Sequence, residues 1–528
     1  MLVYYVITPI LVGVFLYLFS TAKAGRVIAI AAQAVFVGFS VYLFLLSKEG
    51  DIVTRVGNFN SVMGITLRVD TLAAVFVVLV ALIFLIAAIY SFNEDNNQKY
   101  WFFMFIWQAL LIGTFITRDF FNLFIMFEVM TVIVAVLIMF RRDTRSMYDG
   151  MLYLVVNAIA TQFYLLGLGY VYKLAGSVDM DAVIPFLHSL DKESLILPYA
   201  LIISGVSVKC ALIPVFSWLP KAHGAPGAPP AVSAILSGLH IKCAVYIFIR
   251  VHEVFQPIAV TELFFVIGIV TSIVGFMMAL SQIDIKLILA YHTISQIGLI
   301  MIGLNIGNSY AFTGGVYHII NHAFFKAALF MCAGIIYEMY GTKNIYKIRG
   351  VLKRMPLVGV TIIMASLGIT GAPFFNGSIS KYFIMYETNA VMTVVFTVIN
   401  LGTIISFLKY STMLYGTHEV SADHVKPDMF KQVAAFSLGV LCFAGGIFGE
   451  SFIWLLFDTE VSVDHAGYIE KSGMFVISVG IGYLIYKYYV KKSKFFAYIR
   501  NLELSFRQIC ICMGGFIALV IITAKLIR

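Results

Sequence analysis

Long apolar runs separated by short polar links dominate the hydrophobic pattern of the chain. A helix of about 20 apolar residues is long enough to cross the hydrocarbon core of a bilayer. Windows of this kind recur along the whole chain, and no link between them is long enough to fold as a separate soluble domain. We therefore predict an all-α polytopic membrane protein with about 16 transmembrane helices. The expected segments lie near residues 1–20, 27–47, 71–91, 101–117, 119–140, 151–173, 197–221, 230–250, 259–281, 285–304, 311–337, 356–388, 389–415, 431–457, 471–490 and 507–527.

Two of these apolar runs are interrupted by proline and glycine. Segment 197–221 carries Lys209 and is broken at Pro214, and segment 356–388 contains the run GAPFFNG with Lys381 just beyond it. Proline removes a backbone donor and clashes with the preceding turn, so these segments should be broken helices. A break at membrane depth is tolerable only against protein or a water-filled cavity, which makes an ion path the default interpretation.

The two broken segments occupy corresponding places in the two halves of the chain. Broken helices in such positions are typical of transporters built from inverted repeats. We expect N-terminal helices in residues 1–100 and C-terminal helices in 431–528, with one five-helix repeat in 101–252 and a second in 259–415. Broken helices 7 and 12 would each be the fourth member of a repeat.

Composition supports a membrane location, because 61% of the residues are hydrophobic and 12% are charged. The net charge of +9 could suggest nucleic-acid binding, but the basic residues form short clusters between apolar runs. Lys and Arg are about twice as numerous on one set of alternating links, which includes Arg141, Arg142 and Lys426, as on the other. By the positive-inside rule the richer face is cytoplasmic. We therefore expect a multi-pass protein of the cytoplasmic membrane with both termini outside and no nucleic-acid partner.

Motifs for a bound cofactor are absent from the sequence. There is no glycine-rich loop of the Walker or Rossmann type and no convincing nucleophile–base motif. The six cysteines lie inside apolar segments, and Cys510 and Cys512 form C-x-C without a histidine-rich partner. We expect inert buried thiols, no cofactor and no metal site.

Glu128 lies in the apolar run RDFFNLFIMFEVMTVIVAVLIMF, with no opposite charge within one turn of its own helix. A lone carboxylate at this depth needs a cation from another span, and Lys209 is the best candidate. The alternative is a static ion pair that joins two helices, although such a pair adds little stability.

His318, His322 and Lys326 lie at i, i+4 and i+8 and so share one helical stripe. The H-x-x-x-H spacing could also ligate zinc, but no carboxylate lies close by as a third ligand. Because histidine titrates near neutral pH, we favour a proton relay.

Three further charged or titratable residues lie within expected spans. His240 and Lys242 are well inside segment 230–250, and an ammonium group at membrane depth costs about 2.5–3.5 kcal/mol on the insertion scale. Lys409 lies in segment 389–415, where it is either buried or extends to the cytoplasmic edge of the membrane.

Several stretches resemble the antiporter-like subunits of ion-translocating membrane complexes. These subunits include the D-type subunit of Mrp-type Na+/H+ antiporters and the proton-translocating subunits of complex I and of membrane-bound hydrogenases. The similar stretches are DFFNLFIMFE (119–128), VSVKCALIPVFSWLPKAHGAPGAPPAVSAILSGLHIKCAVYIFIR (206–250), DIKLILAYHTISQIG (284–298), HIINHAFFKAALFMCAG (318–334) and GAPFFNGSISK (371–381).

The resemblance implies which residues carry the ion. The functional glutamate of the family falls on Glu128, and its lysines fall on Lys209, Lys242 and Lys381, with its histidines on His318 and His322. Two positions differ from the family pattern. Phe216 stands where a histidine usually precedes Ser-Trp-Leu-Pro, which puts one proton carrier in doubt, and Ala372 replaces the first of a usual proline pair.

The resemblance also implies a fourteen-helix core with two inverted five-helix repeats and two additional C-terminal helices. The implied function is translocation of protons, with Na+ as an open alternative, by one subunit of a complex that contains other membrane subunits. Withdrawal of Glu128 from Lys209 would release a proton along Lys242, the two histidines and Lys381 through bound water.

Two functional settings share this sequence chemistry. One is an Mrp-type cation/proton antiporter, in which the chain resembles the D-type subunit. The other is the ion-pumping membrane subunit of a redox-driven complex, such as a membrane-bound hydrogenase or a complex I-like assembly. The chain itself is expected to hold no redox centre, so membership of an enzyme depends on its partners. A lipid-linked transferase is disfavoured, because such an enzyme needs acidic pairs and a substantial external loop.

Overall fold

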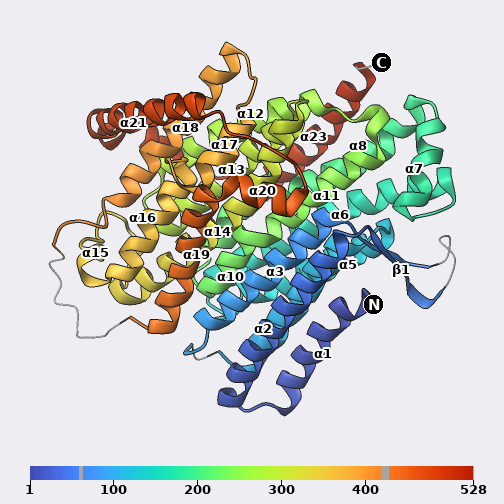
Figure 1. Ribbon diagram of the computed structural model, residues 1–528, viewed down its shortest axis with the longest axis horizontal. Coiled ribbons are helices and arrows are strands. Elements are labelled where there is room, and N and C mark those ends of the chain that lie inside the picture. Colours follow the sequence, from blue (N-terminus) through green and yellow to red (C-terminus); the bar gives the residue numbers. More distant parts are fainter. Residues whose placement is uncertain (59–63, 95, 418–426, 527–528) are drawn as a thin grey trace. The chain divides into compact units, whose positions relative to one another are not determined.

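The computed structural model describes residues 1–58, 64–94, 96–417 and 427–526, most of which are helical (Figure 1). The chain forms two compact units. The first unit comprises Met1–Ala228, Leu239–Leu263 and Leu504–Arg528, and the second comprises Pro229–Gly238 and Phe264–Glu503. Lys426, one of the residues used to predict orientation, lies outside the described residues.

The described residues of the first unit contain a short β-hairpin and eleven α-helices. These elements are α1 (Val3–Phe19), α2 (Ala22–Ser47), β1 (Ile52–Arg55), β2 (Thr66–Val69), α3 (Thr71–Tyr90), α4 (Gln98–Ile116), α5 (Phe120–Ile138), α6 (Thr144–Ala175), α7 (Met180–Ser189), α8 (Lys192–Lys209), α9 (Trp218–Gly224), α11 (Ile241–Val254) and α23 (Phe506–Leu526).

The second unit is helical in its described residues. It contains α10 (Pro230–Ile235), nearly all of α12 (Thr261–Ser281), α13 (Ile285–Asn305), α14 (Ser309–Tyr340), α15 (Val351–Arg354), α16 (Pro356–Thr370), α17 (Asn376–Ile384), α18 (Ala390–Ser411), α19 (Met429–Ile447), α20 (Gly449–Phe457), α21 (His465–Tyr488) and α22 (Lys494–Arg500). A π-helical turn, Leu236–His240, joins α10 to α11, and single 3-10 turns lie at Val56–Asn58, Gln256–Ile258 and Val490–Lys492.

The expected spanning segments are present as helices. Thirteen helices in the described part of the chain are long and apolar enough to cross a membrane. Helices α1 and α16 are shorter apolar helices of 17 and 15 residues, and α8 has 18 residues. Helices α8 and α16 belong to the two segments for which a break was predicted. The prediction of an all-α polytopic membrane protein is confirmed, whereas the fourteen-helix core stays a prediction.

A β-hairpin and helix α7 are among the elements that lie in stretches that the hydrophobic pattern leaves as links. Strands β1 and β2 pair antiparallel, with Ile52 opposite Val69. Helix α7 buries Met180, Val183 and Leu187, which lie on one face at helical spacing. Both elements are far shorter than a membrane span, so a search for 20-residue apolar windows does not detect them.

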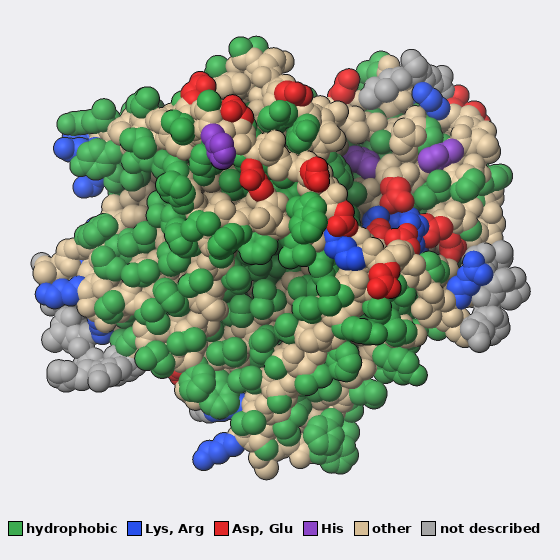
Figure 2. Space-filling model, viewed as in Figure 1, with side chains coloured by type: hydrophobic (Ala, Val, Ile, Leu, Met, Phe, Trp, Pro, Cys, Tyr) green, Lys and Arg blue, Asp and Glu red, His purple; other side chains and the backbone are tan. Residues whose placement is uncertain are grey.

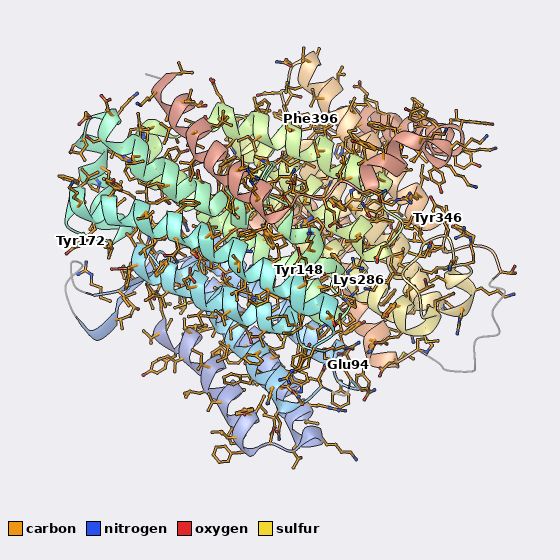
Figure 3. The ribbon with its side chains drawn as sticks, turned by 180° about the vertical axis from the view of Figure 1, so that it is seen from behind. Glu94, Tyr148, Tyr172, Lys286, Tyr346 and Phe396 are labelled. Carbon is orange, nitrogen blue, oxygen red and sulfur yellow. The ribbon has the colours of Figure 1, made fainter. Side chains whose placement is uncertain are left out.

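Helix α6 is longer than the hydrocarbon core of a bilayer. Tyr148 near its start and Tyr172 near its end are both exposed and lie toward opposite ends of the helix (Figure 3). At 1.5 Å per residue these tyrosines are about 36 Å apart along the axis, compared with a core of about 30 Å. Exposed tyrosines at that spacing fit the two membrane–water interfaces.

The two units repeat a set of local features. Helices α6 and α14 both have 32 residues and both end at a glycine in the left-handed conformation, Gly176 and Gly341. The residue before α5 pairs with the chain just after α6 through an isolated bridge to Asp179, and the residue before α13 pairs with Asn344 just after α14 in the same way. This correspondence supports the predicted repeats in 101–252 and 259–415, which stay a prediction.

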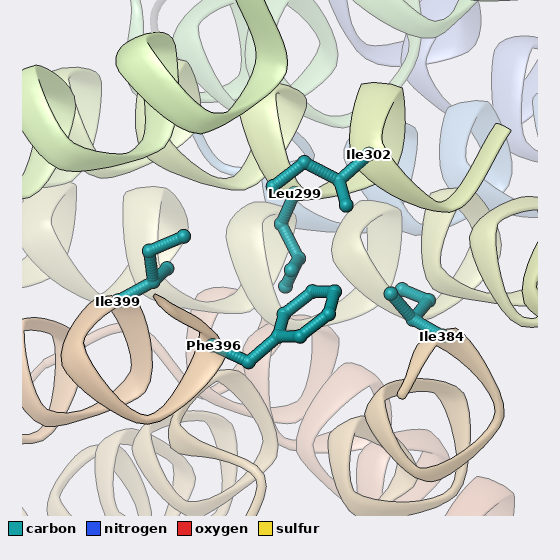
Figure 4. Packing of buried hydrophobic residues seen from close by; sticks show 5 residues of the cluster. All are labelled: Leu299, Ile302, Ile384, Phe396 and Ile399. Carbon is teal, nitrogen blue, oxygen red and sulfur yellow. The ribbon is translucent and has the colours of Figure 1, made fainter. Parts of the chain in front are cut away.

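Apolar side chains fill the space between α13, α17 and α18 in the second unit. Leu299 and Ile302 of α13 pack against Ile384 of α17 and against Phe396 and Ile399 of α18 (Figure 4). Each of the five is at most 3% exposed. This packing holds the second part of the broken helix against its neighbours.

Candidate functional site

Helix α8 ends at Lys209 because the chain cannot continue as a helix beyond it. Ala211 has a φ of 54°, in the left-handed region, and Pro214 has no N–H group to donate. The indole N–H of Trp218 donates to the carbonyl oxygen of Val208 at 2.8 Å, which satisfies one acceptor at the helix end. The break therefore places Lys209, which is 4% exposed, in the last turn of a capped helix.

The ammonium group of Lys209 faces α5. Its Nζ donates to Thr131 Oγ1 at 3.1 Å and lies 4.9 Å from the centroid of the Phe127 ring. Glu128 of the same helix is half-buried, and its carboxylate attracts Lys209 electrostatically while it accepts a hydrogen bond from the Thr161 hydroxyl. Lys209 therefore donates its hydrogen bond to a neutral oxygen, that of Thr131. The Glu128 carboxylate acts on the ammonium group of Lys209 by electrostatic attraction, without a direct hydrogen bond.

His240 ends the π-helical turn Leu236–His240, a rare backbone form that is often found at functional sites. Its Nε2 lies 3.0 Å from the hydroxyl of Tyr153, and the charge of Lys209 acts on its ring. Lys242 is fully buried in the next helical turn. The first unit thus brings His240 into electrostatic range of Lys209.

The second broken helix carries Lys381. Gly371 follows α16 with a φ of 77°, and a β-carbon there would lie 3.0 Å from Cδ of Lys381. Glycine therefore permits the backbone turn and leaves room for the lysine. The Nζ of Lys381 donates to the carbonyl oxygen of Ile369 at 2.7 Å and to Asn400 Oδ1 at 2.8 Å. A carbonyl near the end of α16 thus accepts a hydrogen bond from the buried ammonium group.

The predicted stripe of His318, His322 and Lys326 lies on α14, and all three side chains are 0% exposed. The Nδ1 of His318 lies 2.8 Å from Ser380 Oγ, and its Nε2 lies 3.0 Å from Gln296 Oε1. The ring centroids of His318 and His322 are 6.4 Å apart. His318 therefore connects α14 with α13 and with the second part of the broken helix.

Two other buried lysines bind backbone carbonyl groups. The Nζ of Lys326 donates to Leu289 of α13 at 2.8 Å. The Nζ of Lys409 donates to Leu280 at 2.8 Å and also to Gln282, at the end of α12. Lys409 is 2% exposed, so of its two predicted positions the structure shows the buried one.

His292 of α13 is a buried polar residue that the sequence reasoning missed. It is 0% exposed, and within the described ranges neither ring nitrogen has a hydrogen-bond partner. Its ring lies 5.0 Å from that of Phe407, and the charges of Lys326, Lys381 and Lys409 all act on it. A buried imidazole in such a position needs a polar partner, and bound water can supply one. The only sequence signal was a histidine within an apolar run.

Each unit thus holds its own set of predicted site residues. The structure places Glu128, Lys209, His240 and Lys242 in the first unit and His318, His322, Lys326, Lys381 and Lys409 in the second. Within the described residues, no group of three or more His, Cys, Asp or Glu side chains is arranged to hold a metal ion.

The sequence reasoning also missed a network of charged side chains in the first unit. Arg118 lies 2.6 Å from Asp181 and 2.8 Å from Glu253, and Arg250 contacts both Glu253 and Asp70. Acidic and basic side chains gather on the face where β1 and α7 lie (Figure 2). We call this set the arginine network, and its members are Asp51, Arg68, Asp70, Arg118, Asp181, Arg250 and Glu253.

The arginine network shifts the ionisation of its members outside the spanning segments. Burial raises the pKa of Asp70, but the attraction of Arg250 and a hydrogen bond from the Ala73 N–H group outweigh burial, so its pKa lies below the ordinary 3.8. Burial lowers the pKa of Arg118, but hydrogen bonds to Glu253 and Asp181 outweigh it, so its pKa is raised. Both shifts favour the charged forms at neutral pH.

Comparison with known proteins adds family evidence to this geometry. Residues 117–406 match the family model described as NADH:quinone oxidoreductase/Mrp antiporter, transmembrane. The match includes both broken helices and all nine predicted site residues except Lys409, which lies three residues beyond it.

Curated relatives include subunits of antiporters and of an NADH-quinone oxidoreductase. The chain is 29% identical to the D-type Na+/H+ antiporter subunit of Alkalihalophilus pseudofirmus over 76% of this chain and 84% of the relative. It is 32% identical to the N-type NADH-quinone oxidoreductase subunit of Desulforudis audaxviator over 61% of this chain and 66% of that relative.

Solved structures share the fold. A chain of the Mrp complex from Dietzia sp. DQ12-45-1b matches with a TM-score of 0.80 and 23% identity, over 90% of this chain and 99% of that chain. A chain of an archaeal membrane-bound sulfane sulfur reductase also matches with a TM-score of 0.80, at 21% identity, over the same fractions. Because the family model covers more than half of the sequence, the chain belongs to the NADH:quinone oxidoreductase/Mrp antiporter transmembrane family.

Proposed function

We propose that the chain translocates protons across the cytoplasmic membrane as one subunit of a multisubunit complex, in the role of the D-type subunit of an Mrp-type Na+/H+ antiporter. The relatives named for that activity support this proposal. We further propose that both termini lie outside and that the partners are other membrane subunits.

One observation carries the proposal. Lys209, Lys326, Lys381 and Lys409 are buried, and each donates to neutral oxygen atoms of hydroxyl, amide or backbone carbonyl groups. Lys431, in contrast, pairs directly with the Glu338 carboxylate at 2.6 Å. An ion-paired lysine is held in its charged state. Buried lysines bound by neutral acceptors can instead serve as proton carriers.

Within the first unit, we propose that Glu128 controls Lys209. Because no hydrogen bond joins Glu128 to Lys209 directly, a movement of the Glu128 side chain would change their electrostatic interaction and leave the hydrogen bond from Lys209 to Thr131 intact. His240, on which the charge of Lys209 acts and which contacts Tyr153, would receive the released proton.

Within the second unit, we propose a relay through His318, His322 and Lys326 to Lys381 and Lys409. His292 would join this relay, because three of the lysines act on it and bound water can bridge its ring to a polar neighbour. Ser380 and Gln296 hold the His318 ring from both sides and so fix its orientation within the relay.

A redox-driven pump is the second candidate, and one observation favours it. The chain also matches the N-type subunit of an NADH-quinone oxidoreductase and a chain of a sulfane sulfur reductase. Purification of the native complex separates the two. Iron–sulfur subunits in the complex would indicate a redox pump, and small membrane subunits alone would indicate an antiporter.

The test uses the complete complex in proteoliposomes that contain a pH-sensitive dye. Lys209→Met should lower proton transport at least tenfold, because the ammonium group in the broken helix is lost. Lys431→Met is the matched control, since this lysine is also buried but is paired. Transport at the wild-type rate in the Lys209 variant would rule out the proposed role. Imposed Na+ and pH gradients, applied separately, identify the counter-ion.

A further inference from the structure

A cavity opens beside Lys381 in the second unit. It lies between α17, α18 and α21, with one wall from α13, and encloses about 850 Å³ including its mouth. Figure 1 shows α21 alongside α18.

Helix α21 contributes polar side chains to the lining of this cavity, together with Met474 and Phe475. Tyr468, Lys471 and Ser478 line it, at positions that share one helical face. On the other side of α21, Ile469 is 71% exposed and Val476 is 66% exposed. A spanning helix with apolar side chains outward and several polar side chains inward is suited to contact lipid on one side and a polar ligand on the other.

Two ammonium groups reach the cavity from different helices. Lys381 uses two of its three N–H donors for Ile369 and Asn400, which leaves one donor for an occupant. The Nζ of Lys471 lies 4.2 Å from the centroid of the Tyr382 ring. Both lysines are part of the lining. The lining of the cavity therefore carries two ammonium groups, one of which belongs to the buried lysine of the broken helix.

No carboxylate offsets these charges within the cavity. The described lining residues include no Asp or Glu, although Glu470 acts on Lys471 from the adjacent position of α21. The hydroxyl groups of Tyr468 and Ser378, which hydrogen-bond to each other at 2.8 Å, add neutral polar atoms to the lining. An anion would thus meet cations and hydroxyl groups and no opposing charge in the lining.

The remaining wall is apolar. Leu299, Ile384, Phe396 and Ile399, four members of the packed cluster shown in Figure 4, face the cavity. Burial of hydrocarbon against such a wall contributes about 25 cal/mol per Å². A ligand that matches both the ammonium groups and the apolar side chains of the lining has an anionic head and an apolar tail.

We propose that this cavity binds an anionic amphiphile, with its carboxylate or phosphate head between Lys381 and Lys471 and its acyl chain along Leu299, Phe396 and Ile399. Either a free fatty acid or an anionic phospholipid provides this chemistry. Because the head would neutralise Lys381, occupancy should inhibit ion transport; this consequence rests on the proposed function, whereas binding does not.

The test uses photo-crosslinking of the purified complex with a diazirine-bearing palmitic acid and, separately, a diazirine-bearing phosphatidylglycerol. Crosslinked peptides should map to α18 or α21, and unlabelled palmitate should compete while neutral palmitamide should not. Lys471→Met should lower the labelling at least tenfold. Lys487→Met, on the exposed side of the same helix, should leave it unchanged. The probe that labels more strongly identifies the source of the ligand.

Three results would overturn the proposal: equal labelling of wild type and Lys471→Met, equal competition by palmitamide, or labelling no stronger than at the exposed helices α1 and α2. Lys209→Met separates this proposal from the proposed function, because it should lose transport and retain labelling. If that variant retained transport while Lys471→Met lost labelling, the cavity would stand and the transport mechanism would fail. Inhibition by palmitate in wild type, but not in Lys471→Met, would support the regulatory consequence.

Discussion

At the scale of residues, Lys209 and Glu128 differ in how well their surroundings tolerate an unpaired charge. Lys209 is 4% exposed and depends on one hydroxyl and one aromatic ring. Glu128 is half-buried, and Thr161 and Gln162 donate to it. Removal of the Glu128 carboxylate should therefore cost more than removal of the Lys209 ammonium group, because it leaves the more deeply buried charge unpaired. An uncompensated buried charge costs about 3–5 kcal/mol at full burial.

We predict that Glu128→Gln impairs assembly of the complex more than Lys209→Met does. The double variant should assemble better than Glu128→Gln alone, because neither charge remains. The yield of intact complex on size-exclusion chromatography measures the assembly of each variant. The direct pair Lys431–Glu338 provides a positive control for coupling. Strictly additive defects for Glu128 and Lys209 would show that the two charges do not interact.

At the scale of elements, a side-chain hydrogen bond reinforces the backbone hydrogen bonds across the break after α8. Trp218 closes it through the Val208 carbonyl, one residue before Lys209. Both the indole and the carbonyl lie in a fully buried region. The Val208 carbonyl also accepts from the Ala211 N–H group at 3.0 Å, so loss of the indole donor removes one hydrogen bond, a net contribution of about 0.5–1.5 kcal/mol.

We predict that Trp218→Phe lowers the thermal unfolding midpoint and slows transport, because the end of α8 loses its hydrogen bond to the indole and Lys209 shifts. Trp107→Phe is a matched control: Trp107 is also 0% exposed, but among the described residues its indole N–H has no acceptor. Differential scanning fluorimetry of the purified complex measures the midpoints. Equal losses for both variants would mean that the aromatic volume, not the hydrogen bond, matters at the break.

The helices and their breaks could be predicted because local sequence determines them. Apolar length specifies a span, and Pro214 or Gly371 interrupts one wherever the rest of the fold lies. His292 was missed because its significance comes from lysines on three other helices. The burial of Lys409 was left open because its partners, Leu280 and Gln282, are more than 120 residues away in sequence. Long-range contacts of this kind have no periodic signature.

At the scale of the whole molecule, the same limit applies to the arginine network. Its members come from the β-hairpin, the α4–α5 link, α7 and the end of α11, and no motif relates them. Within the first unit the network ties these distant stretches together by ionic contacts. Its arginines are buried, at 2% for Arg118 and 8% for Arg250, so its disruption should be far costlier than loss of a surface pair.

The pH dependence of stability should report on this network. The pKa of Asp70 is lowered in the folded protein, so the unfolded chain binds the proton more tightly. Asp70 therefore stabilises the fold above its ordinary pKa near 3.8, and that contribution is lost as the pH falls through the lowered folded pKa. The midpoint of thermal unfolding should fall as the pH decreases below about 4.

Arg250→Gln should change both the stability at neutral pH and the dependence of stability on pH. At neutral pH the variant should lose about 3–5 kcal/mol, because Asp70 and Glu253 lose a buried partner. Removal of Arg250 takes away its attraction and its hydrogen bond, both of which lower the pKa of Asp70, so that pKa should rise. The loss of stability between about pH 5 and 3 should then become smaller or reverse sign. Arg145→Gln, which replaces an exposed arginine that lies 3.8 Å from Asp149 and outside the arginine network, should keep the wild-type curve. If Arg250→Gln instead retained the wild-type slope, Asp70 would not be the group that links this network to pH.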